Sequence, residues 1–386
     1  MSLLDDLADV GRAPGGGYAR HGFDRAETEM RHWFREQAGR RGLDVDTDRN
    51  GNLWAWWGAP GPDALVTGSH LDSVPGGGAF DGPLGVVSAL EAVSRLQERK
   101  FRPARPFAVV VFAEEEGGRF GVPCLGSRLL TGAIDPDRAR ALRDPGGITL
   151  AEAAAQAGVD PRHFGRDDVT LQRIGTFVEL HVEQGRALDV PVGVGSTVLE
   201  HGRWRFSFTG QGNHAGTTVL RDRRDPMLPA AEVVLAARRA ASTMDARATV
   251  GRLVPRPGGT NVIPSTVDLW LDARGNSRDV VAELTEAAER AAAAEGCTVT
   301  VTEESYGDTV TFDPALRDRL TGLLDAPELP TGAGHDAAIL AAHVPTAMLY
   351  VRNPTGISHA PEEFAEDADI EAGVVALARV LETLST

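Results

Sequence analysis

Short apolar runs that end in His, Asp or Glu alternate with helical patterns through the first third of this chain. The run "ALVTGSHL" (64–71) precedes the helical pattern "LGVVSALEAVSRLQER" (84–99), and the β-rich run "RPFAVVVFAEEEG" (105–117) follows it. This order is typical of a mixed, mostly parallel sheet with helices on both faces. In such sheets the chemistry gathers where parallel strands end. We therefore expect an α/β fold with its functional site at one edge of the sheet.

Ligand-type side chains recur at the expected strand ends and in the loops that follow them. The loop "GSHLDSVPGGGAFDGP" is rich in glycine, which lets a backbone turn sharply and approach an ion closely. The candidate ligands collected along the chain are His70, Asp81, Glu116, His181 and His359. A pair of divalent ions that share one Asp needs such a set, because each ion takes about three protein ligands and keeps an open position. The sequence predicts two divalent ions, with Zn or Mn first and Co or Ni also suited to these ligands.

Residues beside these ligands are expected to support them. The Asp72 side chain is predicted to accept the second N–H of His70 and to fix its tautomer. Adjacent residues of an extended chain point to opposite sides, so Glu116 can bind metal while Glu115 faces the substrate as a general base. We expect Glu114, the first of the three glutamates, in a solvated acidic turn.

The sequence pattern changes after residue 197. Segments such as "RWRFSFTG", "STVDLWLDAR" and "RDVVAELTEAAERAAAAEG" alternate strands with helices in the manner of an α+β open sandwich. From about residue 310 the earlier pattern returns. We therefore predict a metal-binding catalytic domain made of residues 1–197 and 310–386, with residues 198–309 inserted into it.

Charge and composition exclude several classes of protein. The net charge of −16 and the pI near 5.1 repel nucleic acid, and the arginines are spread along the chain without a basic patch. Lys100 is the single lysine and is expected at a helix end, which argues against Schiff-base chemistry. A G-x-x-x-x-G-K-[ST] phosphate loop is absent.

Cysteine use and hydropathy indicate the compartment. Cys124 and Cys297 are far apart and unaccompanied, so we expect two reduced thiols. No stretch approaches the ~20 apolar residues of a membrane span, and the acidic start "MSLLDDLADVGR" lacks the core of a signal peptide. We expect a cytoplasmic protein without a membrane partner.

A series of motifs in a fixed order covers nearly the whole chain. They are "GSHLDSVPGGGAFDGPLGV", "EEEGGRFG", "GSR", "HVEQG", "GNHAGTT", "NVIPS", "LDAR", "GAGHDA" and "GISHAPEE". Together they resemble the amidase and carbamoylase branch of the M20 metallopeptidase family, and "HVEQG" with "GNHAGTT" separates that branch from M20 dipeptidases and deacylases. The resemblance implies a metal-dependent hydrolase of C–N bonds, as in allantoate amidohydrolases, N-carbamoyl-L-amino-acid hydrolases and β-ureidopropionases.

The resemblance also divides the five ligands into two sets. They are His70, Asp81 and His181 for one ion, and Asp81, Glu116 and His359 for the other. Asp81 would bridge the ions. Glu115 would deprotonate the water between them and later pass the proton to the leaving nitrogen.

By the same resemblance, the inserted domain is a lid that also joins two chains into a homodimer. The residues implied in substrate recognition are Gln184, His214, Asn261 and Arg274. Arg274 would clamp the α-carboxylate of the substrate, for which a planar, two-pronged donor is suited. His214 would reach into the partner subunit's site and stabilise the tetrahedral oxyanion.

Two departures from the family pattern bear on the substrate. Val219 and Leu220 replace the usual Pro and Met after "HAGTT", and "VRNPTG" precedes the last histidine motif. Arg352 and Asn353 would either recognise a second carboxylate or a ureido group, or only shape their loop. The reaction class does not depend on this choice.

Several functions stay open at this point. Allantoate is the predicted substrate, and an N-carbamoyl-L-amino acid is the alternative. The next candidates are another short N-acyl amino acid, such as an N-formyl compound, and a dipeptide. A metal-free binding protein on the same fold is the rival from outside the enzymes, and the intact ligand set argues against it.

Overall fold

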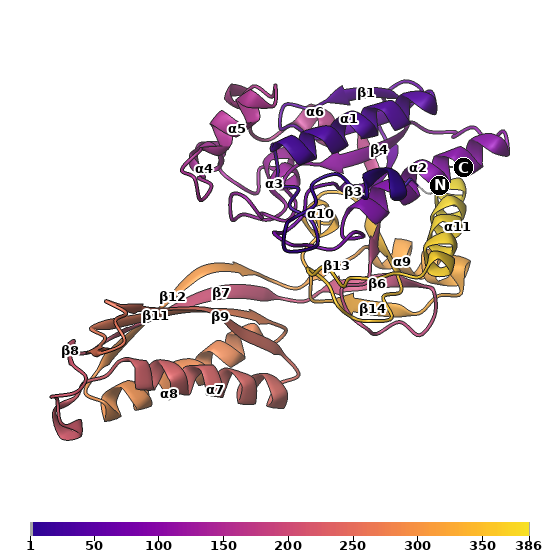
Figure 1. Ribbon diagram of the computed structural model, residues 1–386. Coiled ribbons are helices and arrows are strands. Elements are labelled where there is room, and N and C mark those ends of the chain that lie inside the picture. Colours follow the sequence, from indigo (N-terminus) through magenta and orange to yellow (C-terminus); the bar gives the residue numbers. More distant parts are fainter. Residues whose placement is uncertain (1–2, 386) are drawn as a thin grey trace. The chain divides into compact units, whose positions relative to one another are not determined.

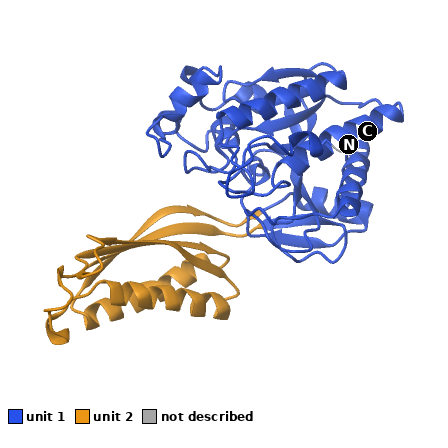
Figure 2. Cartoon of the chain, viewed as in Figure 1, with its two compact units in different colours: residues 1–197, 311–386 blue, residues 198–310 orange. Residues whose placement is uncertain are grey.

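The computed structural model describes residues 3–385, and the chain divides into two compact units. Unit 1 consists of residues 1–197 and 311–386, and unit 2 of residues 198–310 (Figure 2). Each unit has an apolar cluster of its own. The sequence of unit 2 therefore interrupts that of unit 1.

Within the described residues, unit 1 is built on a nine-stranded sheet in the order β1-β2-β4-β3-β5-β15-β6-β13, with β14 paired to β6 (Figure 1). The strands are β1 (Asp44–Thr47), β2 (Leu53–Trp57), β3 (Ala64–His70), β4 (Phe107–Phe112), β5 (Ile174–Val182), β6 (Val192–Val198), β13 (Val310–Thr311), β14 (Glu328–Thr331) and β15 (Thr346–Val351). The central strands β4, β3, β5 and β15 run parallel, whereas β2 and β6 join them antiparallel. The predicted mixed, mostly parallel sheet is confirmed.

Helices lie on both faces of this sheet. They are η1 (Asp5–Leu7), α1 (Arg25–Arg40), α2 (Pro83–Glu98), α3 (Leu125–Thr131), α4 (Pro136–Ala141), α5 (Leu150–Gln156), η2 (Pro161–His163), α6 (Asp168–Leu171), α9 (Pro314–Leu324), α10 (Asp336–Leu340) and α11 (Asp367–Leu384). On β5, Val178 and Leu180 join the apolar cluster of α2 and α11, whereas Glu179 accepts a hydrogen bond from the backbone N–H of Ala337 in α10. Because side chains alternate along a strand, α2 and α10 cover opposite faces.

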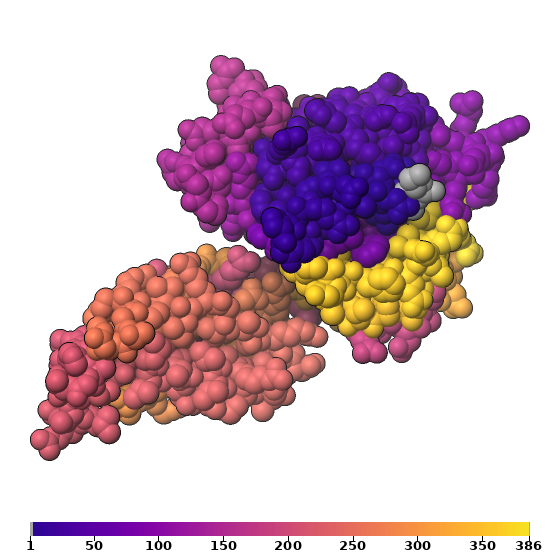
Figure 3. Space-filling model, viewed as in Figure 1, coloured from indigo at the N-terminus to yellow at the C-terminus, as the bar shows by residue number. Residues whose placement is uncertain are grey.

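This double cover explains the composition of the central strands. The strand β4, "FAVVVF", is buried along its whole length and has no polar face. Figure 3 shows the indigo N-terminal region of unit 1 next to its yellow C-terminal region, and Leu7 shares an apolar cluster with Leu384 of α11. No helix among residues 3–385 is both long and apolar enough to cross a membrane.

The described residues of unit 2 form a four-stranded antiparallel sheet, β12-β7-β11-β9, a two-stranded sheet and two long helices. The elements are β7 (His201–Thr209), β8 (Asn213–His214), η3 (Leu220–Asp222), α7 (Met227–Thr243), β9 (Arg247–Arg256), β10 (Val262–Ile263), β11 (Thr266–Arg274), α8 (Ser277–Ala294) and β12 (Thr298–Gly307). Along β7, Trp204, Phe206 and Phe208 are buried in the cluster that contains the helices, whereas Arg203 and Arg205 form ion pairs on the other face. This alternation is that of a sheet with one covered face.

Gly68 lies where β3 passes close to β4. Its φ is 148°, and an added Cβ would overlap the backbone carbonyl of Val110.

A backbone atom cannot move aside as a flexible side chain does, so we expect Gly68→Ala to destabilise the protein by about 3 kcal/mol or more. Urea unfolding followed by circular dichroism measures this change. The matched control is Gly39→Ala in α1, where an added Cβ meets no atom within 4 Å and a gain of about 0.5 kcal/mol is expected. Equal midpoints for the two variants would contradict the close approach.

Candidate active site

The predicted ligands lie where the parallel strands of unit 1 end. His70 is the last residue of β3, and His181 is the penultimate residue of β5. Glu116 and His359 lie in the loops after β4 and β15, and Asp81 lies just before α2. Residues far apart in the sequence are therefore gathered at one edge of the sheet, where folds of this kind place their sites.

A first group consists of His70, Asp81 and His181, all buried. The Oδ1 atom of Asp81 lies 3.2 Å from Nε2 of His181 and 3.5 Å from Nε2 of His70. Each Nδ1 contacts a backbone carbonyl, that of Val182 at 2.9 Å and that of Asp72 at 3.1 Å. Because Nδ1 donates its proton there, each Nε2 directs a lone pair toward the carboxylate. Neither Nε2 atom has a hydrogen-bond partner in the described part of the chain.

The first group fits a divalent cation. A lone pair and a carboxylate repel each other unless positive charge lies between them. Two ligand atoms bound at about 2.1 Å to a tetrahedral ion lie roughly 3.4 Å apart, close to the two distances found here. Burial lowers the pKa of His181, but the close contact with the Asp81 carboxylate and its negative charge outweigh burial and raise that pKa. The surroundings of His181 therefore favour a positive charge at this point.

Asp81 also belongs to a second group, with Glu116 and His359. Its Oδ2 atom lies 3.3 Å from Nε2 of His359, which lies 3.3 Å from Oε2 of Glu116. The φ of His359 is 56°, a strained conformation for a residue other than glycine and one that persists at functional positions. A carboxylate whose two oxygens face separate ligand groups has the arrangement of a ligand that bridges two ions.

Gln184 lies beside the second group. Its Nε2 donates to Oδ2 of Asp81 at 2.7 Å and contacts Nε2 of His359 at 3.2 Å. Its Oε1 atom is buried and has no hydrogen-bond partner among residues 3–385. The amide is thus held at the ligands by its nitrogen and keeps an acceptor for another molecule.

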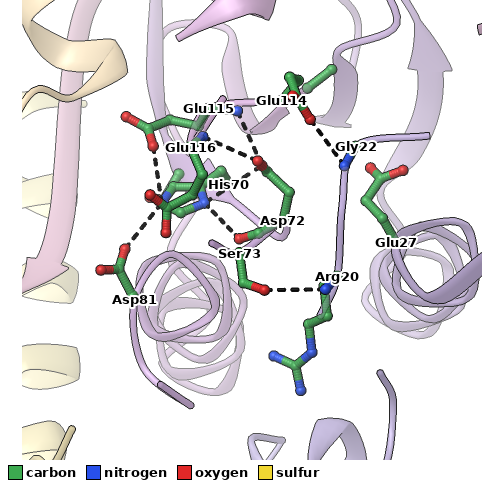
Figure 4. Close-up of polar contacts among 12 residues, drawn as sticks. Arg20, Gly22, Glu27, His70, Asp72, Ser73, Asp81, Glu114, Glu115 and Glu116 are labelled. Atoms are coloured by element: carbon green, nitrogen blue, oxygen red, sulfur yellow. Dashed lines mark hydrogen bonds and ion pairs between the residues drawn. The ribbon is translucent and has the colours of Figure 1, made fainter. Parts of the chain in front are cut away.

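Asp72 supports the site in a different way from the one predicted. Its carboxylate lies 3.6 Å from Nδ1 of His70, and its backbone carbonyl is the nearer acceptor at 3.1 Å. The chain turns after β3, which brings this carbonyl to the imidazole and leaves the carboxylate free for the next strand end. There it accepts the backbone N–H groups of Glu115 at 3.1 Å and Glu116 at 3.0 Å (Figure 4). One residue thereby fixes a ring and two backbone groups.

The expectation of a solvated turn at Glu114 is wrong. Glu114 is 1% exposed. Its side chain accepts the backbone N–H groups of Gly22 (Figure 4), Arg119 and Phe120. Its φ of 51° departs from the extended chain that the expectation assumed. Burial and then the charge of Asp72 raise its pKa to about 8. Glu114 is therefore a structural residue that holds the loop after β4.

Glu115 faces the first group. Its Oε2 atom lies 3.6 Å from Nε2 of His70 (Figure 4), and the residue is 5% exposed. Burial raises the pKa of Glu115 well above its usual range, the charge of His70 opposes this, and the charge of Asp336 adds to it. A carboxylate in this position is able to take up and hold a proton beside the ligand group.

Two of the predicted substrate residues lie together in unit 2. His214 is part of β8, which pairs with β10, and the backbone N–H of Ala215 donates to the carbonyl of Asn261 at 3.0 Å. Nδ1 of His214 accepts the N–H groups of Gly216 at 3.0 Å and Thr217 at 3.2 Å. The proton of the neutral ring therefore lies on Nε2, and this exposed side chain offers an N–H donor.

Arg274 lies apart from these two residues. It ends β11, whereas β10 precedes Thr266 at the other end of that strand. The eight steps from Thr266 to Arg274, at about 3.3 Å each, span about 26 Å. Arg274 pairs with His201 in the sheet, close to the start of unit 2, and its Nε donates to Asp272 at 2.9 Å.

Arg352 and Asn353 shape their own loop. Arg352 forms ion pairs with Asp369 at 2.8 Å and Glu366 at 3.3 Å, both at the start of α11. The fully buried Asn353 donates to the carbonyl of Ile357 at 2.8 Å. Of the two roles considered for these residues, the structure favours the structural one.

The structure adds Glu363, which the sequence did not single out. Its side chain is 5% exposed, and Oε1 accepts the backbone N–H groups of Phe80 at 2.9 Å and Asp81 at 3.0 Å. Glu363 therefore fixes the backbone of Asp81, the residue that the two groups share. The motif "GISHAPEE" contains it, but two adjacent glutamates give no indication of which one turns inward.

Comparisons with known proteins agree with one another. Residues 66–383 match the model of peptidase family M20/M25/M40. An N-carbamoyl-L-amino acid amidohydrolase of Geobacillus stearothermophilus is 36% identical over 392 residues, which cover 97% of this chain and 95% of that protein. An allantoate amidohydrolase of Bacillus subtilis is 29% identical over 99% of this chain and 96% of its own length. The crystal structure of a hydantoinase/carbamoylase family amidase from Burkholderia vietnamiensis has a TM-score of 0.88 and 30% identity, with 99% of this chain and 95% of that one covered.

The two groups predict how metal content responds to substitution. Protein saturated with Mn or Zn and then desalted is expected to hold about two ions per chain. Asp81→Asn should lose most of both, because Asp81 faces both groups, whereas His359→Ala should keep about one. Inductively coupled plasma mass spectrometry measures the content. Glu371→Gln, which changes an exposed carboxylate paired with Arg95, should hold as much metal as the wild type. Full occupancy in Asp81→Asn would exclude a shared ligand.

Proposed function

The chain belongs to the M20 peptidase family, as its motifs predict, and we propose that it is the two-ion amidohydrolase of an N-carbamoyl α-amino acid. Relatives along nearly the whole chain are amidohydrolases, so the chain is an enzyme that acts on C–N bonds. One observation carries the proposal. The two oxygens of Asp81 face separate ligand groups, with the buried carboxylate of Glu115 beside the first.

The residues of the two groups would hold the ions. His70, Asp81 and His181 would bind one ion, and Asp81, Glu116 and His359 the other. Bound ions polarise a carbonyl oxygen and lower the pKa of a water molecule. Imidazole and carboxylate ligands suit Zn, Mn, Co and Ni, and we favour Zn or Mn.

Glu115 would carry the proton in this reaction. It accepts a proton from the water that attacks the carbamoyl carbon, and Asp72 keeps its backbone in place meanwhile. The C–N bond to the amino acid then breaks, and Glu115 returns the proton to the leaving nitrogen. The products are the free amino acid and carbamic acid, which decomposes to ammonia and carbon dioxide.

Gln184 and three residues of unit 2 would bind the substrate. Arg274 would pair with the α-carboxylate, and the Nε2–H group of His214 would stabilise the oxyanion. Because Arg274 and the pair of His214 with Asn261 lie near opposite ends of β11, a single small substrate cannot contact both within one unit 2. A site that takes Arg274 from one chain and His214 with Asn261 from its partner removes this difficulty.

A homodimer through unit 2 suits this requirement. The strand β9 is an edge of the four-stranded sheet, with one side free to pair. On α7, which packs against β9, Leu228 is 53% exposed and Leu235 is 59% exposed. An unpaired edge beside exposed apolar side chains is a surface that a second copy would cover.

The substrate class rests on two observations. Arg352 and Asn353 are occupied within their loop, which removes the reason to expect a second ureido group. The relative from Geobacillus stearothermophilus is named for N-carbamoyl-L-amino acids. We therefore place these substrates first, and allantoate, the first choice from sequence, second because of the Bacillus subtilis relative.

Ammonia release from a panel of substrates tests the proposal. The panel contains N-carbamoyl-L-amino acids with apolar and acidic side chains, allantoate and N-carbamoyl-β-alanine, and formate release from N-formyl-glutamate is followed in parallel. We expect the highest kcat/KM with an N-carbamoyl-L-amino acid. Glu115→Gln is the blank, and its kcat should fall by about 10³-fold or more while metal content is kept. Turnover of the formyl compound alone would overturn the assignment.

Mixed dimers test the shared site. Chains with His214→Ala and chains with Glu115→Gln should each be nearly inactive alone. After subunit exchange, a mixed dimer contains one site with both residues intact, so up to about a quarter of the wild-type activity should return. Mass spectrometry of the intact dimers verifies the exchange. Exchange without recovery would place His214 in the site of its own chain.

A further inference from the structure

Cys124 lies opposite the proposed general base in a fixed register. The backbone N–H groups of residues 124–126 donate to the carbonyl groups of residues 115, 114 and 113, at 2.6, 3.0 and 2.9 Å. Three consecutive hydrogen bonds thus join the segment before and within α3 to the loop that follows β4. The side chain of Cys124 therefore has a defined position relative to that of Glu115.

The thiol contacts the carboxylate directly. Sγ of Cys124 lies 3.3 Å from Oε1 of Glu115, and the cysteine is 3% exposed. The other carboxylate oxygen, Oε2, is the one that lies 3.6 Å from Nε2 of His70. In the described part of the chain, no other side chain donates a hydrogen bond to this carboxylate. The thiol therefore donates to Oε1, whereas Oε2 is the carboxylate oxygen that lies near the first ligand group.

The backbone of Cys124 is in an unfavourable conformation. Its φ is 53° and its ψ is 38°, in the left-handed region. This conformation costs a residue with a Cβ atom about 1 kcal/mol, whereas glycine adopts it freely. A side chain kept at this cost and aimed at a functional carboxylate indicates a use for that side chain.

The chemistry of the thiol suits an orienting contact. Burial and then the charge of Glu115 raise the pKa of Cys124 well above its usual range, so the sulfur keeps its proton. A thiol is a weak donor compared with a hydroxyl or an amide. It therefore holds a carboxylate in place while lowering its basicity less than a stronger donor would.

We infer that Cys124 is a positioning residue, whose S–H group holds Oε1 of Glu115 and so keeps Oε2 turned toward the first ligand group. This inference rests on the proposed function of Glu115 as the general base. It concerns the orientation of the base and leaves the binding of metal and substrate to other residues. Loss of the thiol should therefore lower kcat and leave KM and metal content unchanged.

Substituting Cys124 by alanine and by serine separates the effect of the hydrogen-bond donor from the effect of the rest of the side chain. Both have one Cβ without branching, as cysteine does, so the backbone penalty at residue 124 stays the same. With the best substrate of the panel, Cys124→Ala should lower kcat roughly tenfold, with KM within about twofold of wild type. Cys124→Ser restores a donor and should recover most of the lost kcat. Metal content and melting temperature are measured for each variant.

Two controls make the result specific. Cys297→Ala, which removes the cysteine of unit 2, should leave kcat unchanged. In a Glu115→Gln background, Cys124→Ala should cause no further loss of residual turnover, because its effect acts through Glu115. If Cys124→Ala does not fold, Cys124→Gly replaces it, since glycine relieves the backbone and also lacks the donor.

The outcomes separate the inference from the proposed function. An inactive wild type across the panel would end the proposed function. An active wild type with unchanged kcat in Cys124→Ala would overturn the inference alone. Equal losses in the alanine and serine variants, with lower metal content or melting temperature, would also overturn it, because they would show a role in packing.

Discussion

The site depends on one buried carboxylate. Asp81 faces His70 and His181 with one oxygen and His359 with the other, at 3.2 to 3.5 Å. The backbone carbonyls that hold Nδ1 of His70 and His181 leave both Nε2 lone pairs directed at this carboxylate. Such an arrangement of acceptors is stable only around positive charge. Glu363 accepts the backbone N–H of Asp81 and thus fixes the position of the residue that both candidate ligand groups share.

The sheet and the proximity of the candidate ligands could be predicted because both follow from local patterns. The apolar runs of β3 and β4 have the length and composition of strands covered on both faces, and parallel strands must end at a common edge. His70 and the acidic triplet lie at those ends, so their proximity follows from topology. His181 and His359 come later in the sequence and join them because β5 and β15 belong to the same parallel set.

The supporting contacts could not be predicted in the same way. Which group of Asp72 meets His70 depends on a turn after β3, and the period of a strand carries no information about that turn. Glu114 and Glu363 are each adjacent to another glutamate, so composition alone cannot tell which of the neighbours accepts backbone N–H groups. The small helices between β4 and β5 have seven residues or fewer and give little periodicity to read.

Strained backbone links these unpredicted contacts. Glu114, Cys124 and His359 have φ values of 51°, 53° and 56°, although none is glycine. Each conformation costs about 1 kcal/mol. Glu114 and Cys124 are buried, whereas the exposed His359 contacts Asp81 and Glu116. The left-handed turn at Glu114 directs its side chain to backbone N–H donors, so Glu115 faces the candidate ligands. Cys124 contacts the Glu115 side chain from the segment whose backbone is hydrogen-bonded to residues 113–115. The direction of Glu115, the proposed general base, is therefore set by backbone conformation at its neighbours.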